Sequence, residues 1–112
     1  MKKDEREARR LVRERSGGIC ELCGMARATN YQHRKNRSGG GEWSASNGLD
    51  VCGSGTTGDH GYIHAHPAES YERGWSVHSW DDPEVVPVQT WRGWVLLDDE
   101  GAYLESAAVD CG

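Results

Sequence analysis

The first pattern of polar and apolar residues along the chain is that of a surface helix. Residues 3–16 (KDEREARRLVRERS) contain neither Pro nor Gly and alternate Glu with Arg at three- and four-residue spacings, which favours a helix. The apolar positions are only Ala8, Leu11 and Val12, so we expect a narrow buried stripe and an Arg-rich surface that stays largely in water. The pair of glycines that follows should end the helix.

The middle of the chain, residues 19–74, is rich in turn-forming residues. One short strand candidate, Leu49–Cys52, lies between the loops RSGGGEWSASNG and GSGTTGD. A helix is expected from about His60 to Ala65, and Pro67 should break it and begin a second short helix. Backbone as irregular as this indicates an external organiser such as a bound metal ion.

From residue 75 onward the pattern is that of strands. The segments WSVHSW, VVPVQTW, GWVLL and AYLES are strand candidates with a turn at DDEG, which predicts a small antiparallel sheet or hairpin, and the tryptophans should supply much of its core. We therefore expect one α+β domain over residues 1–112. It would comprise a basic N-terminal helix in 1–18, a central part in 19–74, and C-terminal strands with an acidic tail in 75–112.

Composition indicates a thin hydrophobic core. Only 36% of the 112 residues are hydrophobic, Phe is absent and Gly occurs 15 times, so a metal ion would supply stability that the core lacks. The apolar stretches VVPV and WVLL are too short to span a bilayer, and no apolar segment follows the charged N-terminus. We expect a soluble, cytoplasmic protein without a membrane span or secretory signal.

Charge is distributed unevenly along the chain. The net charge is −5, yet residues 1–37 hold 11 of the 13 Lys and Arg and only 5 of the 18 acidic residues. The remaining residues hold 2 basic and 13 acidic residues. A polyanion such as DNA should therefore meet the first third of the chain, although a solvated helix followed by an acidic solubilising tail would give the same pattern.

Cys20 and Cys23 form a C-x2-C knuckle, and Cys52 follows later in the chain. The turn between two cysteines at this spacing points both thiolates inward, which favours one tetrahedral zinc ion. Two disulfides that include Cys111 are not expected where thiols stay reduced, and a redox pair would need a βαβ context that the sequence lacks. We expect a structural zinc site.

His60 and His64 lie four residues apart in the predicted helix, so both rings lie on one face and can hold one metal ion. Histidines at this spacing on a helix surface also occur by chance. The residues that accompany the pair, His33 and Asn47, strengthen the metal-site interpretation. Taken alone, Asn47 in the context SASNG is better explained as a turn residue.

The order of these motifs resembles the HNH nuclease family. It runs from the C-x2-C knuckle through Gln32-His33-Arg34 and SASNGLDVCG to GDHGYIH. The segment VCGSGTTGDHGYIH followed by HPAESYERGWSV is similar to small HNH proteins found in bacteriophage genomes near packaging genes. The resemblance covers about residues 16–100.

The resemblance implies a ββα-metal (His-Me finger) core, in which two strands and a helix hold one divalent ion over the scissile phosphate above a zinc knuckle. His33 would be the general base, Asn47 the middle residue of the motif, and His64 the last histidine, with His60 beside it as a metal ligand. Phosphodiester hydrolysis suits these residue types. A neutral imidazole can deprotonate water, and Mg²⁺, Mn²⁺, Ni²⁺ or Zn²⁺ can neutralise charge on the phosphate.

Two positions depart from the family pattern. Gln32 stands where the family has His or Asp as a metal ligand, and a neutral amide is a poorer ligand for a hard cation. Asp59 stands where the family has a fourth cysteine, and a carboxylate can take that place. With Cys111 as the alternative to Asp59, the structural zinc ligands implied by the resemblance are Cys20, Cys23, Cys52 and Asp59.

Arg34, Lys35 and Arg37 follow His33 closely, and we expect them to bind phosphates; a solvated basic loop is the alternative. The expected function is that of a metal-dependent DNA endonuclease with weak sequence specificity. The resemblance alone implies a phage terminase as partner, in an infected bacterial cell. The alternative function is a zinc-stapled nucleic-acid- or protein-binding module without cleavage, motivated by Gln32 and Asp59. A zinc deaminase is excluded because its H-x-E and P-C-x-x-C motifs are absent.

Overall fold

Helix α1 (Glu5–Ser16) forms where the polar pattern predicts a surface helix. The computed structural model describes residues 4–105 of the chain. The Asp4 side chain caps α1 by accepting a hydrogen bond from a first-turn backbone N–H at 2.9 Å, and Gly17 ends the helix with a φ of 66°. The predicted N-terminal helix and its end are therefore confirmed.

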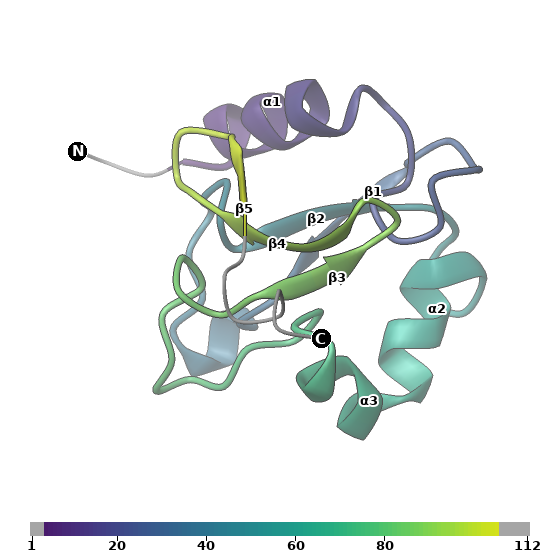
Figure 1. Cartoon of the computed structure of the whole chain (residues 1–112). Coiled ribbons are helices and arrows are strands. Elements are labelled where there is room, and N and C mark those ends of the chain that lie inside the picture. The colour runs from purple at the N-terminus through teal and green to yellow at the C-terminus, as the bar shows by residue number, and fades with distance from the viewer. Residues whose placement is uncertain (1–3, 106–112) are drawn as a thin grey trace.

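Strands β1 (Asn30–His33) and β2 (Gly48–Val51) form a two-stranded antiparallel sheet. Side chains alternate between the faces of a strand, so residues 31 and 33 of β1 face one way and residues 30 and 32 face the other. Helix α1 lies over the first face, where Arg13 Nε is 2.6 Å from Asp50 Oδ2 of β2 (Figure 1). The second face carries Leu49, which is fully buried in the core.

Two short helices meet at Pro67. Helix α2 spans Gly58–Ala65 and α3 spans Pro67–Glu72, so the break predicted at Pro67 is confirmed. Ile63 of α2 is buried in the same core cluster as Leu49, which puts α2 on the side of the β1–β2 sheet that α1 does not cover. Within residues 4–105, no helix has both the length and the hydropathy needed to cross a membrane.

The last three strands of the described chain form an antiparallel sheet. Strands β3 (Val88–Thr90), β4 (Gly93–Leu97) and β5 (Tyr103–Glu105) lie in the order β3-β4-β5. Their buried side chains extend the core formed by β2 and α2, together with Cys20 and Trp75. The α+β class and the C-terminal antiparallel strands are confirmed, and the sheet is one strand smaller than the number of strand candidates.

Residues 75–80 are not a strand, contrary to expectation. The backbone N–H of Val77 donates to the carbonyl of Arg34 at 2.8 Å, so the segment crosses a separate part of the fold and forms no ladder. Trp75 and Val77 are buried, which explains the strand-like alternation of apolar residues. Trp80, expected in the core, is instead 78% exposed.

A buried ion pair links α1 to the cysteine knuckle. Arg15 Nε and Glu21 Oε2 lie 2.7 Å apart, and their side chains are 1% and 0% exposed. Arg15 also donates to the carbonyls of Ala45 and Gly48, and the Tyr103 hydroxyl donates to Glu21. The expectation that the arginines of α1 stay in water is therefore wrong for Arg15, whose donors are satisfied inside the protein.

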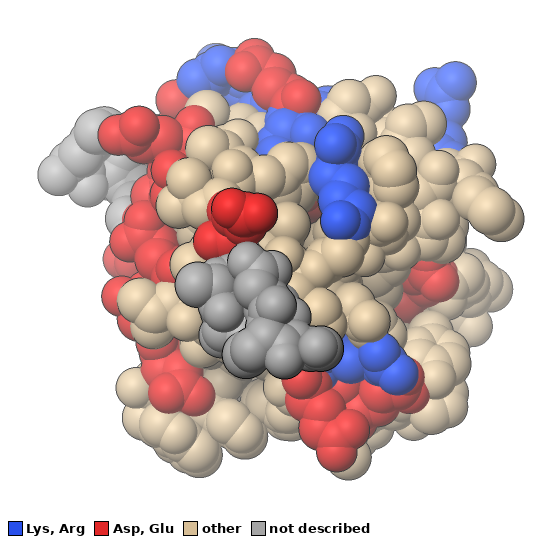
Figure 2. All heavy atoms as spheres, viewed as in Figure 1, with Lys and Arg blue, Asp and Glu red and all other residues tan. Residues whose placement is uncertain are grey.

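Much of the basic charge in the first third of the chain is paired locally. Arg9 binds Glu5, and Arg10 binds both Glu7 and Glu14 along α1. Figure 2 shows acidic side chains gathered along one side and at the bottom of the molecule, with Lys and Arg scattered over the top and centre. The face in that view therefore carries no continuous basic surface that would attract a polyanion.

Candidate functional site

Four candidate metal ligands converge between the cysteine knuckle and the start of α2. One ligand atom from each lies within 4.8 Å of all the others, and the residues are Cys20, Cys23, Cys52 and Asp59. The Sγ atoms of Cys20 and Cys52 lie 3.1 Å and 3.5 Å from Asp59 Oδ2. Tetrahedral ligands at zinc distances lie about 3.5–3.8 Å apart, so the four residues fit a single metal ion. Cys111, the alternative fourth ligand, lies outside the described residues.

Two glycines bring the loop after β2 back to the start of α2. Gly53 and Gly58 have φ angles of 92° and 62°, and a Cβ on Gly53 would lie 2.1 Å from a backbone oxygen of the returning chain. This close approach puts the end of β2 beside the first turn of α2. As a result, the Asp59 backbone N–H lies 3.4 Å from Cys52 Sγ, and both side chains reach the same centre.

Two thiols of this cluster, those of Cys20 and Cys52, have raised pKa values and so hold their protons tightly in the absence of a cation. Burial raises the pKa of Cys20, and the neighbouring Asp59 carboxylate raises it further. Burial is also the largest cause of the raised pKa of Cys52. A bound cation would have to displace these protons, so metal affinity should depend strongly on pH.

A second convergence of possible ligand atoms lies on α2. His60 Nε2 and His64 Nε2 are 3.2 Å apart, with their rings edge to face. Two nitrogens bound to one ion at about 2.1 Å would lie about 3.0–3.4 Å apart in octahedral or tetrahedral geometry. Burial, followed by the neighbouring His64, lowers the pKa of His60, which favours the neutral ring that ligates metals. The pair therefore has the spacing of a cation site, and the neutral form of His60 suits a metal ligand.

Gln32 of β1 lies on the face of the sheet that α2 covers and is 8% exposed. Its Nε2 donates to the carbonyl of His33 at 2.9 Å, which leaves Oε1 without a hydrogen bond among the described residues. No third His, Cys or carboxylate ligand atom in residues 4–105 joins His60 and His64 within 4.8 Å. A third protein ligand from the described residues would thus be a neutral oxygen, the class to which the predicted ligand Gln32 Oε1 belongs.

His33 ends β1 on the opposite face, the face toward α1. Its ring contacts are with Tyr31 and Trp43, at centroid distances of 4.9 and 4.3 Å. Gly48 makes room for this arrangement, because a Cβ there would lie 2.1 Å from the Tyr31 ring. Burial is the main cause of the lowered pKa of His33, and the nearby charge of Arg37 contributes, so the ring is neutral at pH 7.

The two ring nitrogens of His33 differ in environment. Nε2 is buried and has no hydrogen-bond partner among the described residues. Nδ1 makes no hydrogen bond within the described chain either, but it does not belong to the buried atoms and so faces solvent. The nitrogen that a water molecule can reach is therefore Nδ1. His33 makes no ring contact or hydrogen bond with His60 or His64 in residues 4–105.

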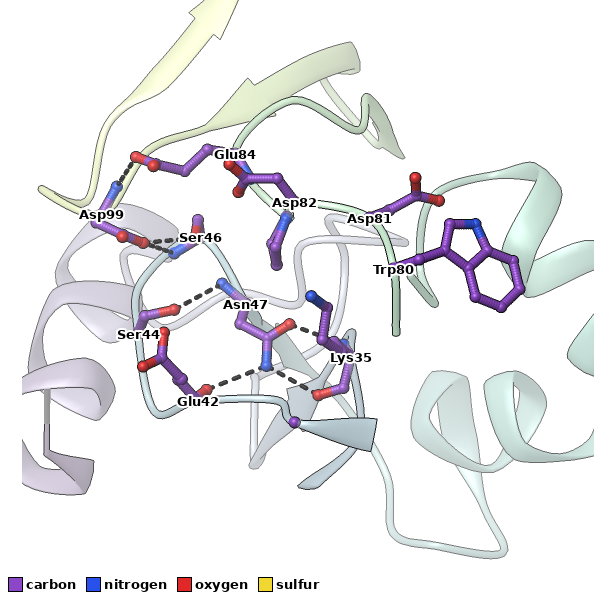
Figure 3. A pocket seen from close by; sticks show the side chains of 12 residues that line it. Lys35, Glu42, Ser44, Ser46, Asn47, Trp80, Asp81, Asp82, Glu84 and Asp99 are labelled. Atoms are coloured by element: carbon purple, nitrogen blue, oxygen red, sulfur yellow. Dashed lines mark hydrogen bonds between the residues drawn. The ribbon is translucent and has the colours of Figure 1, made fainter. Parts of the chain in front are cut away.

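Asn47 braces the loop between β1 and β2. Its Oδ1 accepts from Lys35 N–H at 2.7 Å, and its Nδ2 donates to the carbonyls of Lys35 and Glu42 at 2.9 and 3.0 Å (Figure 3). The side chain is 1% exposed, and its donors and acceptor are all used in these bonds. The structure therefore shows Asn47 fixing the loop between β1 and β2, with both Nδ2 hydrogens and Oδ1 engaged in backbone hydrogen bonds.

Arg34 does not face a substrate, contrary to expectation. It is 2% exposed, and its guanidinium donates to four backbone carbonyls, those of Ser46, Gly74, Pro83 and Val86. With these donors used, the side chain is unavailable to phosphate. Burial without a carboxylate partner lowers the pKa of Arg34 to about 9. Arg34 is therefore a structural residue that ties β1 to the chain that precedes β3.

Arg37 and Lys35 have different surroundings. Arg37 begins the short 3-10 helix Arg37–Gly39, is exposed, and lies with its Cζ 5.6 Å from the centroid of the Trp43 ring. Lys35 lines a cavity of about 440 Å³ together with five carboxylate residues, namely Glu42, Asp81, Asp82, Glu84 and Asp99 (Figure 3). Such a lining repels phosphate, so among the predicted phosphate ligands Arg37 is the one whose surroundings suit that role.

Sequence reasoning did not single out Arg9 or Trp43. The Cζ of Arg9 lies 5.0 Å from the Trp43 ring centroid, so this arginine of α1 approaches the same ring as Arg37 and lies in the neighbourhood of His33. The spacing of Arg residues in the helix carries no signal that selects Arg9, because the contact depends on how α1 packs on β1.

No protein-family model, curated protein or solved structure matches this chain.

Proposed function

We propose that this protein is a metal-dependent endonuclease that hydrolyses phosphodiester bonds in DNA. The observation that carries the proposal is the 3.2 Å separation of His60 Nε2 and His64 Nε2, which suits two ligands of one divalent ion. Gln32 Oε1 would be the third protein ligand. When bound, the ion would neutralise charge that develops on the phosphate and the leaving oxygen.

His33 would act as the general base through Nδ1. Its neutral ring can accept a proton from water at pH 7, because burial and Arg37 lower its pKa. In-line attack on a phosphodiester puts the attacking and leaving oxygens on opposite sides of phosphorus. A base and a cation that serve these two oxygens need not touch, and Gln32 and His33 are consecutive residues at the end of β1, so a phosphate at that end would lie near both.

Asn47 would act as a positioning residue. Its three hydrogen bonds fix the loop that follows His33, and this loop also carries Arg37 and Trp43. Loss of these bonds would loosen the surroundings of the base without removing a group that reacts.

We also propose that the Cys20, Cys23, Cys52 and Asp59 cluster holds a structural zinc ion. Three thiolates and one carboxylate are ligands that zinc accepts, and the four side chains come from segments that share little other regular structure. The ion would fix the start of α2, and with it the orientation of His60 and His64.

The test is nicking of supercoiled plasmid by wild-type protein and by His33→Ala, in Mg²⁺, Mn²⁺, Ni²⁺ and Zn²⁺. His78→Ala is the matched control, because this histidine is stacked between Tyr71 and Trp80 and makes no described ring contact with His33. Nicking that is lost with His33→Ala and retained with His78→Ala supports the proposal. Nicking that survives in His33→Ala removes His33 as the base.

A second candidate is a zinc-stabilised binding module without cleavage. It is favoured by one observation, the lack of a third His, Cys or carboxylate ligand beside His60 and His64 in the described chain. The plasmid experiment separates the two functions. DNA binding together with no nicking in any of the four ions would favour the module.

A further inference from the structure

Two arginines from different elements converge on one tryptophan next to His33. Arg9 of α1 and Arg37 of the 3-10 helix place their Cζ atoms 5.0 and 5.6 Å from the centroid of Trp43. The Trp43 ring itself lies 4.3 Å, centroid to centroid, from the ring of His33. One guanidinium from α1 and one from the loop after β1 thus lie against the same ring, beside the proposed base.

Both guanidiniums are available to an incoming anion. Arg37 is exposed and forms no ion pair within residues 4–105, where the one described contact of its guanidinium is with the Trp43 ring. Within residues 4–105, the carboxylate partner of Arg9 is Glu5 alone, and this pair is half exposed, with side-chain exposures of 51% and 53%. Exposed helix pairs of this kind contribute little stability and exchange readily with another anion.

The charges of both arginines reach His33. Arg37 and Arg9 each disfavour the protonated imidazole, and Glu5 partly offsets them. Arg15 and Arg34 differ from these two arginines, because their guanidinium donors bind buried partners and are not available to an anion. Among the arginines of α1 and the loop after β1, Arg9 and Arg37 are the two that combine access to solvent with proximity to the base.

We propose that Arg9 and Arg37, held by Trp43, form a phosphate clamp that binds a nucleic-acid backbone phosphate beside His33. This inference rests on the proposed function and adds the residues that position its substrate. The guanidinium fork suits phosphate oxygens, and two forks from separate elements fix the phosphate in more than one direction. The clamp reads no base edge, so it contributes affinity and position without sequence preference.

The test is the affinity of a fluorescein-labelled duplex DNA for the full chain, measured by anisotropy over a range of salt concentrations without added Mg²⁺ or Mn²⁺. The variants are Arg9→Gln, Arg37→Gln and the double variant. Arg10→Gln is the matched control, since Arg10 lies on the same helix but is bound by Glu7 and Glu14. Circular dichroism checks that each variant keeps the helix content of the wild type.

Each clamp variant should weaken binding and reduce the slope of log affinity against log salt by about one unit, whereas Arg10→Gln should leave the slope unchanged. Trp43→Phe, which keeps an aromatic ring, should bind more tightly than Trp43→Ala. A double variant with the affinity and slope of Arg10→Gln would overturn the clamp.

The clamp and the nuclease proposal can fail separately. If the double variant has the wild-type dependence of DNA affinity on salt and nicking still depends on His33, the clamp is removed and the nuclease is kept. If the salt dependence of DNA affinity is reduced in the clamp variants and the wild type nicks in none of the ions, the clamp is kept as a DNA-binding site on a protein that does not cleave.

Discussion

His60 Nε2 and His64 Nε2 lie 3.2 Å apart on α2, one helical turn from each other. Because a neutral ring donates at one nitrogen and accepts at the other, the pair can share one proton or, with both Nε2 atoms deprotonated, one cation. The proposed cation site depends on the second arrangement, and its consequences can be measured without any assay of cleavage.

Replacement of one histidine of the pair should weaken binding of a divalent ion. In calorimetric titration of zinc-loaded protein, we expect His64→Ala to bind Mn²⁺ at least about 10- to 100-fold more weakly than the wild type, which is the cost of losing a residue that merely orients a ligand. His64 is itself a proposed ligand, so its loss should cost no less. His78→Gln, which changes a histidine without described contacts to the pair, should leave the affinity unchanged. Equal Mn²⁺ affinity in wild type and His64→Ala would show that α2 holds no such site.

The activity should persist into mildly acidic solution. His33 must be neutral to act as a base, and its pKa lies below the ordinary value of 6.5, chiefly because of burial. Nicking should therefore be lost only as the pH falls through this lowered pKa, and the acid limb of the pH–rate profile should lie below 6.5. In Arg37→Gln the pKa should rise, since a positive charge is removed, and the acid limb should move to higher pH. An acid limb that does not move would exclude His33 as the titrating group.

The buried pair between Arg15 and Glu21 should be essential for stability. Glu21→Ala would leave Arg15 without its carboxylate in a buried site, and the free energy of unfolding should fall by about 3–5 kcal/mol. Glu14→Ala removes the 63%-exposed partner of Arg10 and should cost less than about 1 kcal/mol. Urea denaturation of both variants is the measurement, and similar losses in the two would contradict the structure.

The fourth ligand of the cysteine cluster can be identified by metal analysis. The wild type should carry about one zinc ion per molecule, Asp59→Ala should lose most of it, and Cys111→Ser should keep it. Asp59→Cys should bind zinc more tightly, because thiolate is a softer ligand than carboxylate. Chelation should lower the thermal unfolding temperature of the wild type. Full zinc content in Asp59→Ala would remove Asp59 from the ligand set.

The local sequence patterns predicted the elements whose causes are local. The charged run before Gly17, the proline at position 67 and the spacing of His60 and His64 each act within a few residues, and the structure has the corresponding elements and contacts. The three cysteines of the cluster were also within reach of the sequence, because the knuckle and the strand that ends just before Cys52 are both local signals, whereas Asp59 entered only through the family resemblance.

The features that sequence reasoning missed depend on packing between distant segments. Arg34 sits in a basic run, yet its partners are carbonyls at residues 46 to 86, so composition alone could not distinguish it from Arg37. The alternation in residues 75–80 is that of a strand, but no neighbouring strand is available to pair with it. Trp43 gains its role only when α1 and β1 are brought together.

The most direct test of the central claim is chemical rescue of plasmid nicking in Mn²⁺. We expect His33→Ala to nick at least about 100-fold more slowly than the wild type, because a general base contributes that much or more. Added imidazole should restore part of the rate in His33→Ala, where it can replace the missing proton acceptor, and none in His64→Ala, which lacks a ligand. A His33→Ala protein that nicks as fast as the wild type without imidazole would contradict the account.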